Sequence, residues 1–155
     1  MIEGAEELER KLNSISDGMK KEIIEKAVRK GIQTVRAEAV LMCPVDTGEL
    51  RISIKTNVEV SSDTAFGIVY TNKEYAPYVE FGTGPAGQEN HSEISPEVSP
   101  EYRQTGWSYK DENGEWIYTN GQPAQPFLYP ALKNNETKVK KQIMDEIKDE
   151  LERLV

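Results

Sequence analysis

This chain of 155 residues has little of what enzymatic and metal sites are built from. It holds one cysteine, Cys43, and one histidine, His91, so an internal disulfide and the usual zinc ligand sets are excluded. A Cys–His dyad is the one nucleophile–base combination left. A cysteine that ends an apolar helix behaves as a small buried hydrophobe, and His91 falls in an irregular acidic stretch. The sequence therefore predicts no enzyme, with no catalytic residues, no metal site and no cofactor.

Long apolar runs and an excess of positive charge are missing as well. No apolar run approaches the ~20 residues of a membrane-spanning helix, so we expect no membrane association. A lone cysteine fits a protein made in the reducing cytosol. Nineteen Lys and Arg stand against 27 Asp and Glu, which gives a net charge of −8 and argues against a surface that coats nucleic acid. The length is that of a single domain over 1–155.

The negative charge is concentrated in the middle of the chain. Residues 86–132 hold seven acids against Arg103 and Lys110, a balance of −5. The stretch 17–43 carries +2, and the residues from 133 onward are balanced. Any electrostatic role of the chain is therefore expected to lie in its central part.

Apolar residues at helical spacing predict three helices. A short one covers 2–14, and a long one begins at a cap from Ser16 or Asp17 and ends before Pro44. Gly31 interrupts the long helix and permits the close approach of a neighbour. After Pro130 a last helix runs to the C-terminus.

Strict alternation of apolar and polar residues over 50–60 predicts a strand with one buried face. A second strand follows around Phe66–Tyr70, and Phe66, Tyr70 and Phe81 are expected in the core. One helical turn over 75–80 should begin at Pro77 and stop at Gly82. The fold class is thus α+β: a small antiparallel sheet with the long helix and the C-terminal helix packed on one face.

Residues 85–122 are predicted to leave this domain as a loop-and-hairpin excursion. The part 85–106 lacks any apolar period and reads as a long loop. The part 107–119 reads as a hairpin around Asp111–Gly114. We expect the excursion to be an assembly surface that becomes ordered only in an assembled particle.

The length of the turn decides which aromatic side chains share a face of this hairpin. A two-residue turn sets Tyr109 opposite Tyr118, with Trp107 and Trp116 on the same side. It also sets Glu112 against Glu115, which is unfavourable, so a longer loop is the alternative. The aromatic face either folds back onto its own domain or forms a contact surface for a partner.

Three short motifs stand at the junctions between the periodic segments, and none contains a nucleophile with a base. Gly48, Gly82 and Gly84 mark chain reversals in them where a positive φ is expected. Whether Arg51 pairs with Glu80 is left open by the sequence. In chain order the motifs are Pro44-Val45-Asp46-Thr47-Gly48-Glu49-Leu50-Arg51, Tyr75-Ala76-Pro77-Tyr78-Val79-Glu80-Phe81-Gly82-Thr83-Gly84 and Pro126-Phe127-Leu128-Tyr129-Pro130-Ala131-Leu132.

Together these motifs resemble the tail-completion, or head–tail joining, proteins of long-tailed bacteriophages. The resemblance runs from about Lys20 to the C-terminus. It implies a structural virion protein of the tail or neck that assembles in the host cytoplasm as a ring, usually six-fold, between the tail terminator and the head connector. DNA would pass through the ring without sequence-specific binding.

The resemblance also implies that the motif residues determine fold and assembly and have no catalytic role. With the aromatic residues of the hairpin, the structural and assembly set is Pro44, Asp46, Thr47, Gly48, Arg51, Glu80, Gly82, Gly84, Trp107, Trp116, Tyr118, Pro126, Phe127 and Pro130. The Ser/Pro/Glu loop at 92–101 departs from the family pattern. Two alternatives stay open: another neck or tail ring component, such as a tail terminator or a head-closure protein, and a small enzyme on a borrowed fold with Cys43 and His91 as its candidates.

Overall fold

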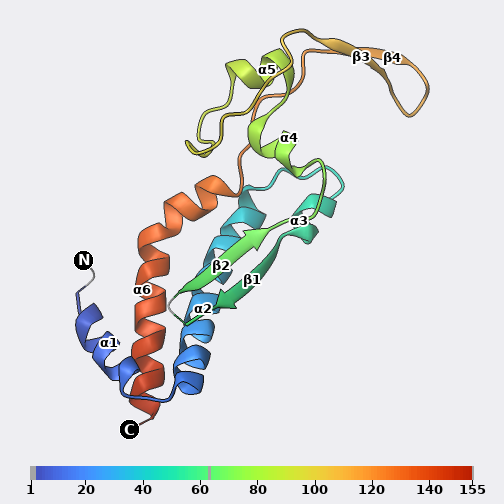
Figure 1. Cartoon of the computed structure of the whole chain (residues 1–155). Helices are drawn as coiled ribbons and strands as arrows, with labels where there is room; N and C mark the ends of the chain where they lie inside the picture. Colours follow the sequence, from blue (N-terminus) through green and yellow to red (C-terminus); the bar gives the residue numbers. More distant parts are fainter. Residues whose placement is uncertain (1–2, 63, 155) are drawn as a thin grey trace. The chain divides into compact units, whose positions relative to one another are not determined.

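A computed structural model describes residues 3–62 and 64–154 of the chain. Helices and two small antiparallel sheets alternate along the chain (Figure 1), so the predicted α+β class is confirmed. The elements, in order, are α1 (Ala5–Asn13), α2 (Asp17–Met42), α3 (Glu49–Ser53), β1 (Lys55–Val60), β2 (Ala65–Tyr70), α4 (Ala76–Phe81), α5 (Gly84–Glu89), β3 (Trp107–Lys110), β4 (Trp116–Thr119) and α6 (Tyr129–Arg153).

The chain divides into two compact units. Unit 1 comprises Met1–Glu38, Lys55–Tyr70 and Leu132–Val155, and unit 2 comprises Ala39–Ile54 and Thr71–Ala131. The single domain expected from the length stays a prediction.

Unit 1 is built on the contact between helices α2 and α6. Its core consists of Ile23 and Ala27 from α2 with Ile147 and Leu151 from α6, and α1 adds partly buried leucines to it. Gly31 lets α6 approach, because a Cβ at this position would lie 2.9 Å from Ile143. The three helices predicted from apolar spacing are confirmed within the described residues; Ile2, the first residue of the predicted range 2–14, lies outside them.

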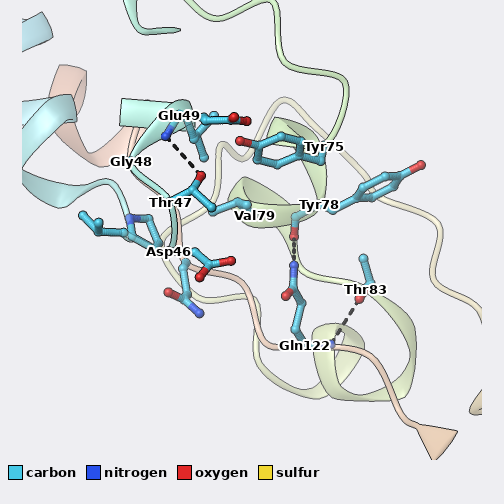
Figure 2. A pocket seen from close by; sticks show the side chains of 13 residues that line it. Asp46, Thr47, Gly48, Glu49, Tyr75, Tyr78, Val79, Thr83 and Gln122 are labelled. Atoms are coloured by element: carbon cyan, nitrogen blue, oxygen red, sulfur yellow. Dashed lines mark hydrogen bonds between the residues drawn. The ribbon is translucent and has the colours of Figure 1, made fainter. Parts of the chain in front are cut away.

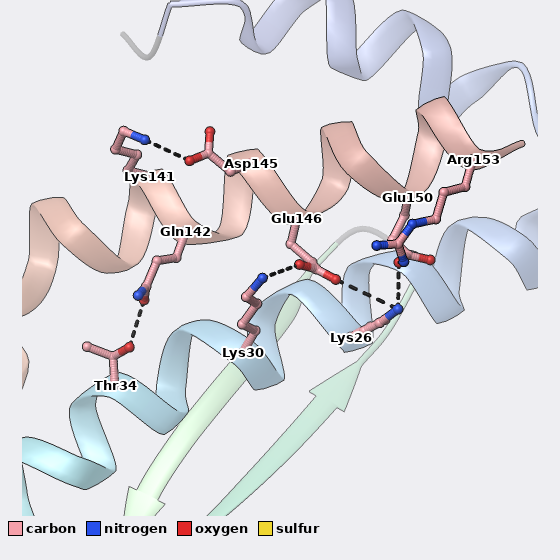
Figure 3. Close-up of polar contacts among 9 residues, drawn as sticks. All are labelled: Lys26, Lys30, Thr34, Lys141, Gln142, Asp145, Glu146, Glu150 and Arg153. Atoms are coloured by element: carbon pink, nitrogen blue, oxygen red, sulfur yellow. Dashed lines mark hydrogen bonds and ion pairs between the residues drawn. The ribbon is translucent and has the colours of Figure 1, made fainter. Parts of the chain in front are cut away.

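Ion pairs run alongside this apolar seam (Figure 3). Lys30 Nζ lies 2.5 Å from Glu146 Oε2, and Lys26 Nζ lies 2.5 Å from Glu150 Oε1. Thr34 donates a hydrogen bond of 2.8 Å to Gln142. The side chain of Glu146 is almost fully buried, so its partners are needed to offset the loss of hydration.

The sheet β1–β2 packs one face on α2. The register pairs Val58 with Gly67, and a Cβ on Gly67 would lie 2.2 Å from Ile32 of α2. Phe66 pairs with Glu59 and Tyr70 pairs with Lys55, so these aromatic side chains lie on the other, exposed face. Phe66 is 60% exposed. The prediction that Phe66 and Tyr70 are core residues is therefore wrong, because the buried face belongs to the alternate positions.

The predicted strand over 50–60 begins too early. Residues Glu49–Ser53 form helix α3, and the strand covers only Lys55–Val60. Leu50, Ser53 and Ile54 are the buried positions, which is helical spacing, whereas Ile52 is 78% exposed. Leu50 and Ile54 lie four residues apart, a spacing that fits both one face of a strand and one face of a helix, and the tertiary environment selects the helix here.

Unit 2 contains the short helices, the irregular loop and the hairpin. Helix α4 matches the turn expected over 75–80, and Gly82 ends it with φ 77°. Residues Gly84–Glu89 form helix α5, so the long loop expected over 85–106 begins only after Glu89. Phe81 is partly buried.

The hairpin β3–β4 has the longer of the two loops considered. Lys110 pairs with Trp116 and Ser108 pairs with Tyr118. The Asp111 amide bonds to the Glu115 carbonyl, so residues 111–115 form the loop. This register places Trp116 and Tyr118 on one face and Trp107 and Tyr109 on the other. The two-residue turn, with both tryptophans on one side, is therefore wrong.

Candidate functional site

The three motifs meet in unit 2, where two of them form the walls of a cleft of about 800 Å³ (Figure 2). The loop between α2 and α3 forms one wall, and Tyr75 with α4 forms the other. Gln122 and Gln125, which precede the third motif, complete the lining. The full set of lining residues is Pro44, Val45, Asp46, Thr47, Gly48, Glu49, Leu50, Tyr75, Tyr78, Val79, Thr83, Gln122 and Gln125.

The first wall owes its shape to backbone conformation and one arginine. Gly48 has φ 84° and precedes α3, and the Glu49 amide lies 3.4 Å from Thr47 Oγ1. Arg51 Nη2 donates a hydrogen bond of 2.8 Å to the Cys43 carbonyl at the end of α2. The guanidinium thus holds both ends of the loop together. Arg51 and Glu80 both bind backbone groups, and no ion pair between them is found in the described part of the chain, so the pairing that the sequence left open is not formed.

Glu80 binds the second motif to the third. Its carboxylate accepts hydrogen bonds from the amides of Phe127 (2.7 Å), Leu128 (3.0 Å) and Tyr129 (3.0 Å). Only 5% of the residue is exposed. Tyr129 begins α6, so the carboxylate satisfies amides at a helix N-terminus, where negative charge is favoured. Phe127 is fully buried and Pro130 is buried in the first turn of α6, where a proline is tolerated.

Hydrogen bonds to the segment 122–125 hold α4 and Thr83 in place on the second wall of the cleft. Thr83 and Gln122 exchange amide–carbonyl bonds of 2.9 and 3.1 Å, and Gln122 Nε2 donates to the Tyr78 carbonyl at 3.1 Å. The Gln125 amide donates to the Val79 carbonyl at 2.8 Å. Gly82 and Gly84 have φ 77° and 60°, so the positive φ expected at these two glycines and at Gly48 is confirmed.

The cleft combines carboxylates with tyrosine rings. Asp46 and Glu49 extend from the loop side toward the α4 side, where Tyr75 and Val79 lie (Figure 2). Asp46, Tyr75 and Tyr78 are exposed. Such a lining suits a cationic group better than a neutral or anionic one.

Cys43 and His91 are not joined by a hydrogen bond in the described part of the chain. The Cys43 sulfur lies 3.5 Å from the Pro44 carbonyl, whereas His91 Nδ1 lies 3.0 Å from the Gly87 carbonyl and its ring stacks near Tyr102. Burial raises the pKa of the Cys43 thiol, and Arg51 opposes this effect only in part. A buried protonated thiol is a poor nucleophile.

The assembly residues predicted on the hairpin lie apart from the lining of the cleft. Trp116 is 71% exposed and Tyr118 is 66% exposed. Lys110 Nζ lies 5.3 Å from the centre of the Trp116 ring. Trp107 is partly buried with Arg103 over its ring at 5.2 Å, and it borders a smaller pocket with Gly82 and Gly84.

Sequence reasoning placed Pro44, Asp46, Thr47 and Gly48 in the assembly set, and these four residues line the cleft. It missed the other lining residues, which are Val45, Glu49, Leu50, Tyr75, Tyr78, Val79, Thr83, Gln122 and Gln125. Gln122 and Gln125 lie in a stretch rich in Gly, Pro and Gln, and nothing in that composition reveals that the backbone there pairs with Thr83 and Val79. The partial burial of Pro126 and the burial of Phe127 agree with a role in the fold.

Among residues 3–62 and 64–154, no group of three or more His, Cys, Asp or Glu side chains could hold a metal ion. None of the helices in the described ranges is long and apolar enough to cross a membrane.

Comparison with known proteins gave one match. Residues 6–82 match the family model HK97-gp10-like, described as "Bacteriophage HK97-gp10, putative tail-component". The matched segment includes the first motif and most of the second, so the resemblance inferred from the motifs is confirmed. The searches of curated proteins and of solved structures found no match.

Proposed function

Since this chain belongs, by its residues 6–82, to the HK97-gp10-like family of phage tail components, we propose that it completes the tail at the head–tail junction as one subunit of a ring. The ring, six-fold by resemblance to tail-completion proteins, would lie between the tail terminator and the head connector. The family membership points to a structural virion protein and away from an enzyme.

The observation that carries this proposal is the exposed aromatic face of the hairpin β3–β4. Trp116 and Tyr118 lie on one face of a two-stranded ribbon and are 71% and 66% exposed. An isolated two-stranded hairpin is marginally stable at best in water. Tryptophan and tyrosine are the residues that most often dominate the binding energy of protein interfaces. A neighbouring subunit or neck protein that covers this face would stabilise the ribbon and bury the rings.

The charge of unit 2 supports a position beside the DNA path. Unit 2 holds eleven acidic residues against four basic ones, a balance of −7, whereas unit 1 holds −1. Carboxylates near a channel repel phosphates, so that DNA slides through and does not adhere. This charge argues against sequence-specific DNA binding and agrees with passage of the genome.

A complementation experiment tests the proposal. Phage that lack this protein are supplied with the wild type, with Trp116→Ala/Tyr118→Ala, or with the control Leu41→Ala, another apolar residue that is more than 70% exposed. We expect the double variant to give filled heads and finished tails that stay separate in electron micrographs, and the control to give normal particles. Cryo-EM of the neck of wild-type particles should show a ring of this protein.

Three outcomes would contradict the proposal. Normal particles with the folded double variant would show that the aromatic face is dispensable. Tails of abnormal length would favour the tail-terminator alternative. Density for this protein outside the neck would exclude the head–tail junction.

A further inference from the structure

We infer that the cleft of unit 2 binds an arginine side chain presented by a neighbouring protein. This inference rests on the proposed function only in taking the occupant to be another component of the particle. It concerns the cleft between the loop 44–49 and α4, whose lining does not include the aromatic face of the hairpin.

The cleft holds two carboxylates that have few partners in the described structure. Asp46 lines it, and no hydrogen bond or ion pair involving this residue is found in the described part of the chain. Glu49 has one ion pair, with Lys73 at 3.6 Å, in which the Glu49 side chain remains 64% exposed. A long, exposed contact of this kind contributes little. Two carboxylates can therefore accept hydrogen bonds from an incoming group.

The α4 side of the cleft supplies aromatic surface, of which the Tyr75 ring lies near Glu49 (Figure 2). Tyr75 and Tyr78 line the cleft and are exposed. Figure 2 shows Glu49 extending toward the Tyr75 ring and Asp46 extending toward Val79. A guanidinium is planar, carries five donors and stacks on aromatic faces, so it uses both walls at once. An ammonium uses the carboxylates but lacks the flat surface, and we therefore expect arginine to bind more tightly than lysine.

The basic residues of unit 2 leave Asp46 without a cationic partner in the described structure. All four of its basic residues already have a contact of their own: Arg51 with the Cys43 carbonyl, Lys73 with Glu49, Arg103 with the Trp107 ring and Lys110 with the Trp116 ring. With a balance of −7, unit 2 attracts cations over a distance of roughly 10 Å at moderate salt. Of these four residues only Lys73 contacts the lining, through Glu49, so Asp46 stays open to a cation from outside unit 2.

Small arginine analogues provide the test with the intact, isotopically labelled chain. N-acetyl-arginine amide is titrated against the protein and the backbone amide shifts are followed by NMR. N-acetyl-citrulline amide is the neutral control of the same shape, and N-acetyl-lysine amide is the charged control. We expect saturable shifts at Thr47, Tyr75 and Val79 with the arginine probe. The lysine probe should bind at least threefold more weakly, and the citrulline probe should cause no saturable change.

Variants separate a built site from general attraction to acid. Asp46→Asn should weaken arginine binding at least fivefold, and Tyr75→Leu at least threefold. Glu97→Gln removes one charge from an exposed position of unit 2 outside the lining and should leave binding within twofold of the wild type. Thermal melts of each variant establish that it is folded.

Equal binding of arginine and citrulline would overturn the inference, and so would equal losses for Asp46→Asn and Glu97→Gln. If Asp46→Asn instead abolished self-association of this chain, the occupant would be a second copy and the assignment to another particle component would be wrong. Failure to bind arginine leaves the head–tail proposal to the complementation experiment, whose variants lie on the hairpin.

Discussion

Different kinds of interaction stabilise the interior of each of the two units. Unit 1 contains no proline and has almost no net charge. Lysine–glutamate pairs such as Lys30–Glu146 lie along its helices. Unit 2 contains all eight prolines and both tryptophans, and its charges do not cancel. In unit 1 side chains pack against side chains along α2 and α6. In unit 2 single side chains capture backbone groups, as Glu80 and Arg51 do.

From this difference we expect single substitutions to lower the stability by different amounts in the two units. A helical pair that buries apolar area spreads its free energy over many contacts, so the loss of one polar contact beside the seam weakens it only slightly. A loop-rich unit also depends on a few buried polar groups, and leaving one of them without its partner costs its full desolvation. We therefore expect the largest single effects in unit 2.

The largest expected effect follows from Glu80→Ala. The change leaves three amides without their acceptor at the start of α6 and should lower the free energy of unfolding by about 3 kcal/mol or more. Glu146→Ala in unit 1 is the matched control, because both residues are 5% exposed; Glu146 has only exposed lysines as partners, which regain water when it is removed. Urea denaturation followed by circular dichroism measures both variants. Equal losses for the two would remove the distinction between the units.

The same contrast explains how much of the fold the sequence could predict. The helices of unit 1 follow from apolar spacing because each stripe meets another stripe. The role of Glu80 could not be predicted, since its partners are backbone amides 47 to 49 residues away and amides carry no sequence signal. The start of the first strand was predicted wrongly because Leu50 and Ile54, four residues apart, fit both periods, and the burial of Ser53, which only a helix explains, carried no sequence signal. In the second strand, the alternation of Phe66 and Tyr70 was visible, but the register that exposes them was not.

The candidate site was predictable only in part. The glycines of the motifs indicated turns, and the positive φ values at Gly48, Gly82 and Gly84 confirm this reading. The sequence placed Asp46 and Thr47 in an assembly set by resemblance alone. It gave no sign that Tyr75 and Val79 line the same cleft as Asp46, because their proximity in space depends on the loop that Arg51 closes.

Replacing two glycines of unit 2 by alanine should lower the stability by different amounts. At Gly82 an added Cβ would lie 2.7 Å from the Ala124 amide nitrogen and 2.8 Å from the Gln122 carbonyl oxygen, in a backbone with φ 77°. At Gly48 the φ is 84°, but nothing lies within 4 Å of the added atom. Gly48→Ala should therefore cost about 1 kcal/mol for the strained φ alone. Gly82→Ala should cost at least about 2 kcal/mol, because rigid backbone must also move.

Thermal unfolding of the two glycine variants measures the difference. A Gly82→Ala protein that melts at the same temperature as Gly48→Ala would show that the pairing of Thr83 with Gln122 shifts without cost. The comparison uses the same change of residue within the same unit, so effects on the unfolded chain largely cancel.

The ion pairs of unit 1 should make its stability depend on pH in a defined window. The hydrogen bond from Lys30 lowers the pKa of Glu146, and the same bond raises the pKa of Lys30. The lowered carboxyl pKa adds stability above the unfolded value of about 4.3, and this is lost as the pH falls through the folded pKa. The raised lysine pKa adds stability below about 10.4, and this is lost as the pH rises through the folded pKa.

The variant Glu146→Gln tests this dependence because it keeps the shape of the side chain and removes its charge. The advantage of the wild type in urea midpoint should be greatest between roughly pH 5 and 10 and should shrink on both sides. Glu136→Gln, from an exposed pair with Lys140 on α6, is the control and should show little dependence. A constant difference across the whole range would mean that Glu146 contributes through packing and that the charge adds nothing.

The smallest effect is expected from replacing Cys43 and His91, the two candidates for a catalytic dyad. Cys43 is buried and its pKa is raised, so at neutral pH it is a thiol and lacks the thiolate needed for attack. The His91 ring contacts the Gly87 carbonyl and the Tyr102 ring, and no hydrogen bond to Cys43 is found in the described part of the chain. Cys43→Ala/His91→Ala should lower stability by about 1 kcal/mol, chiefly through the cavity at Cys43, and should leave the yield of complete particles unchanged.

Because the same complementation experiment tests the hairpin, the two results can be compared directly. A folded double variant that fails to join heads and tails while Leu41→Ala succeeds would place chemistry in this protein after all, whereas normal particles leave assembly to the hairpin and the cleft.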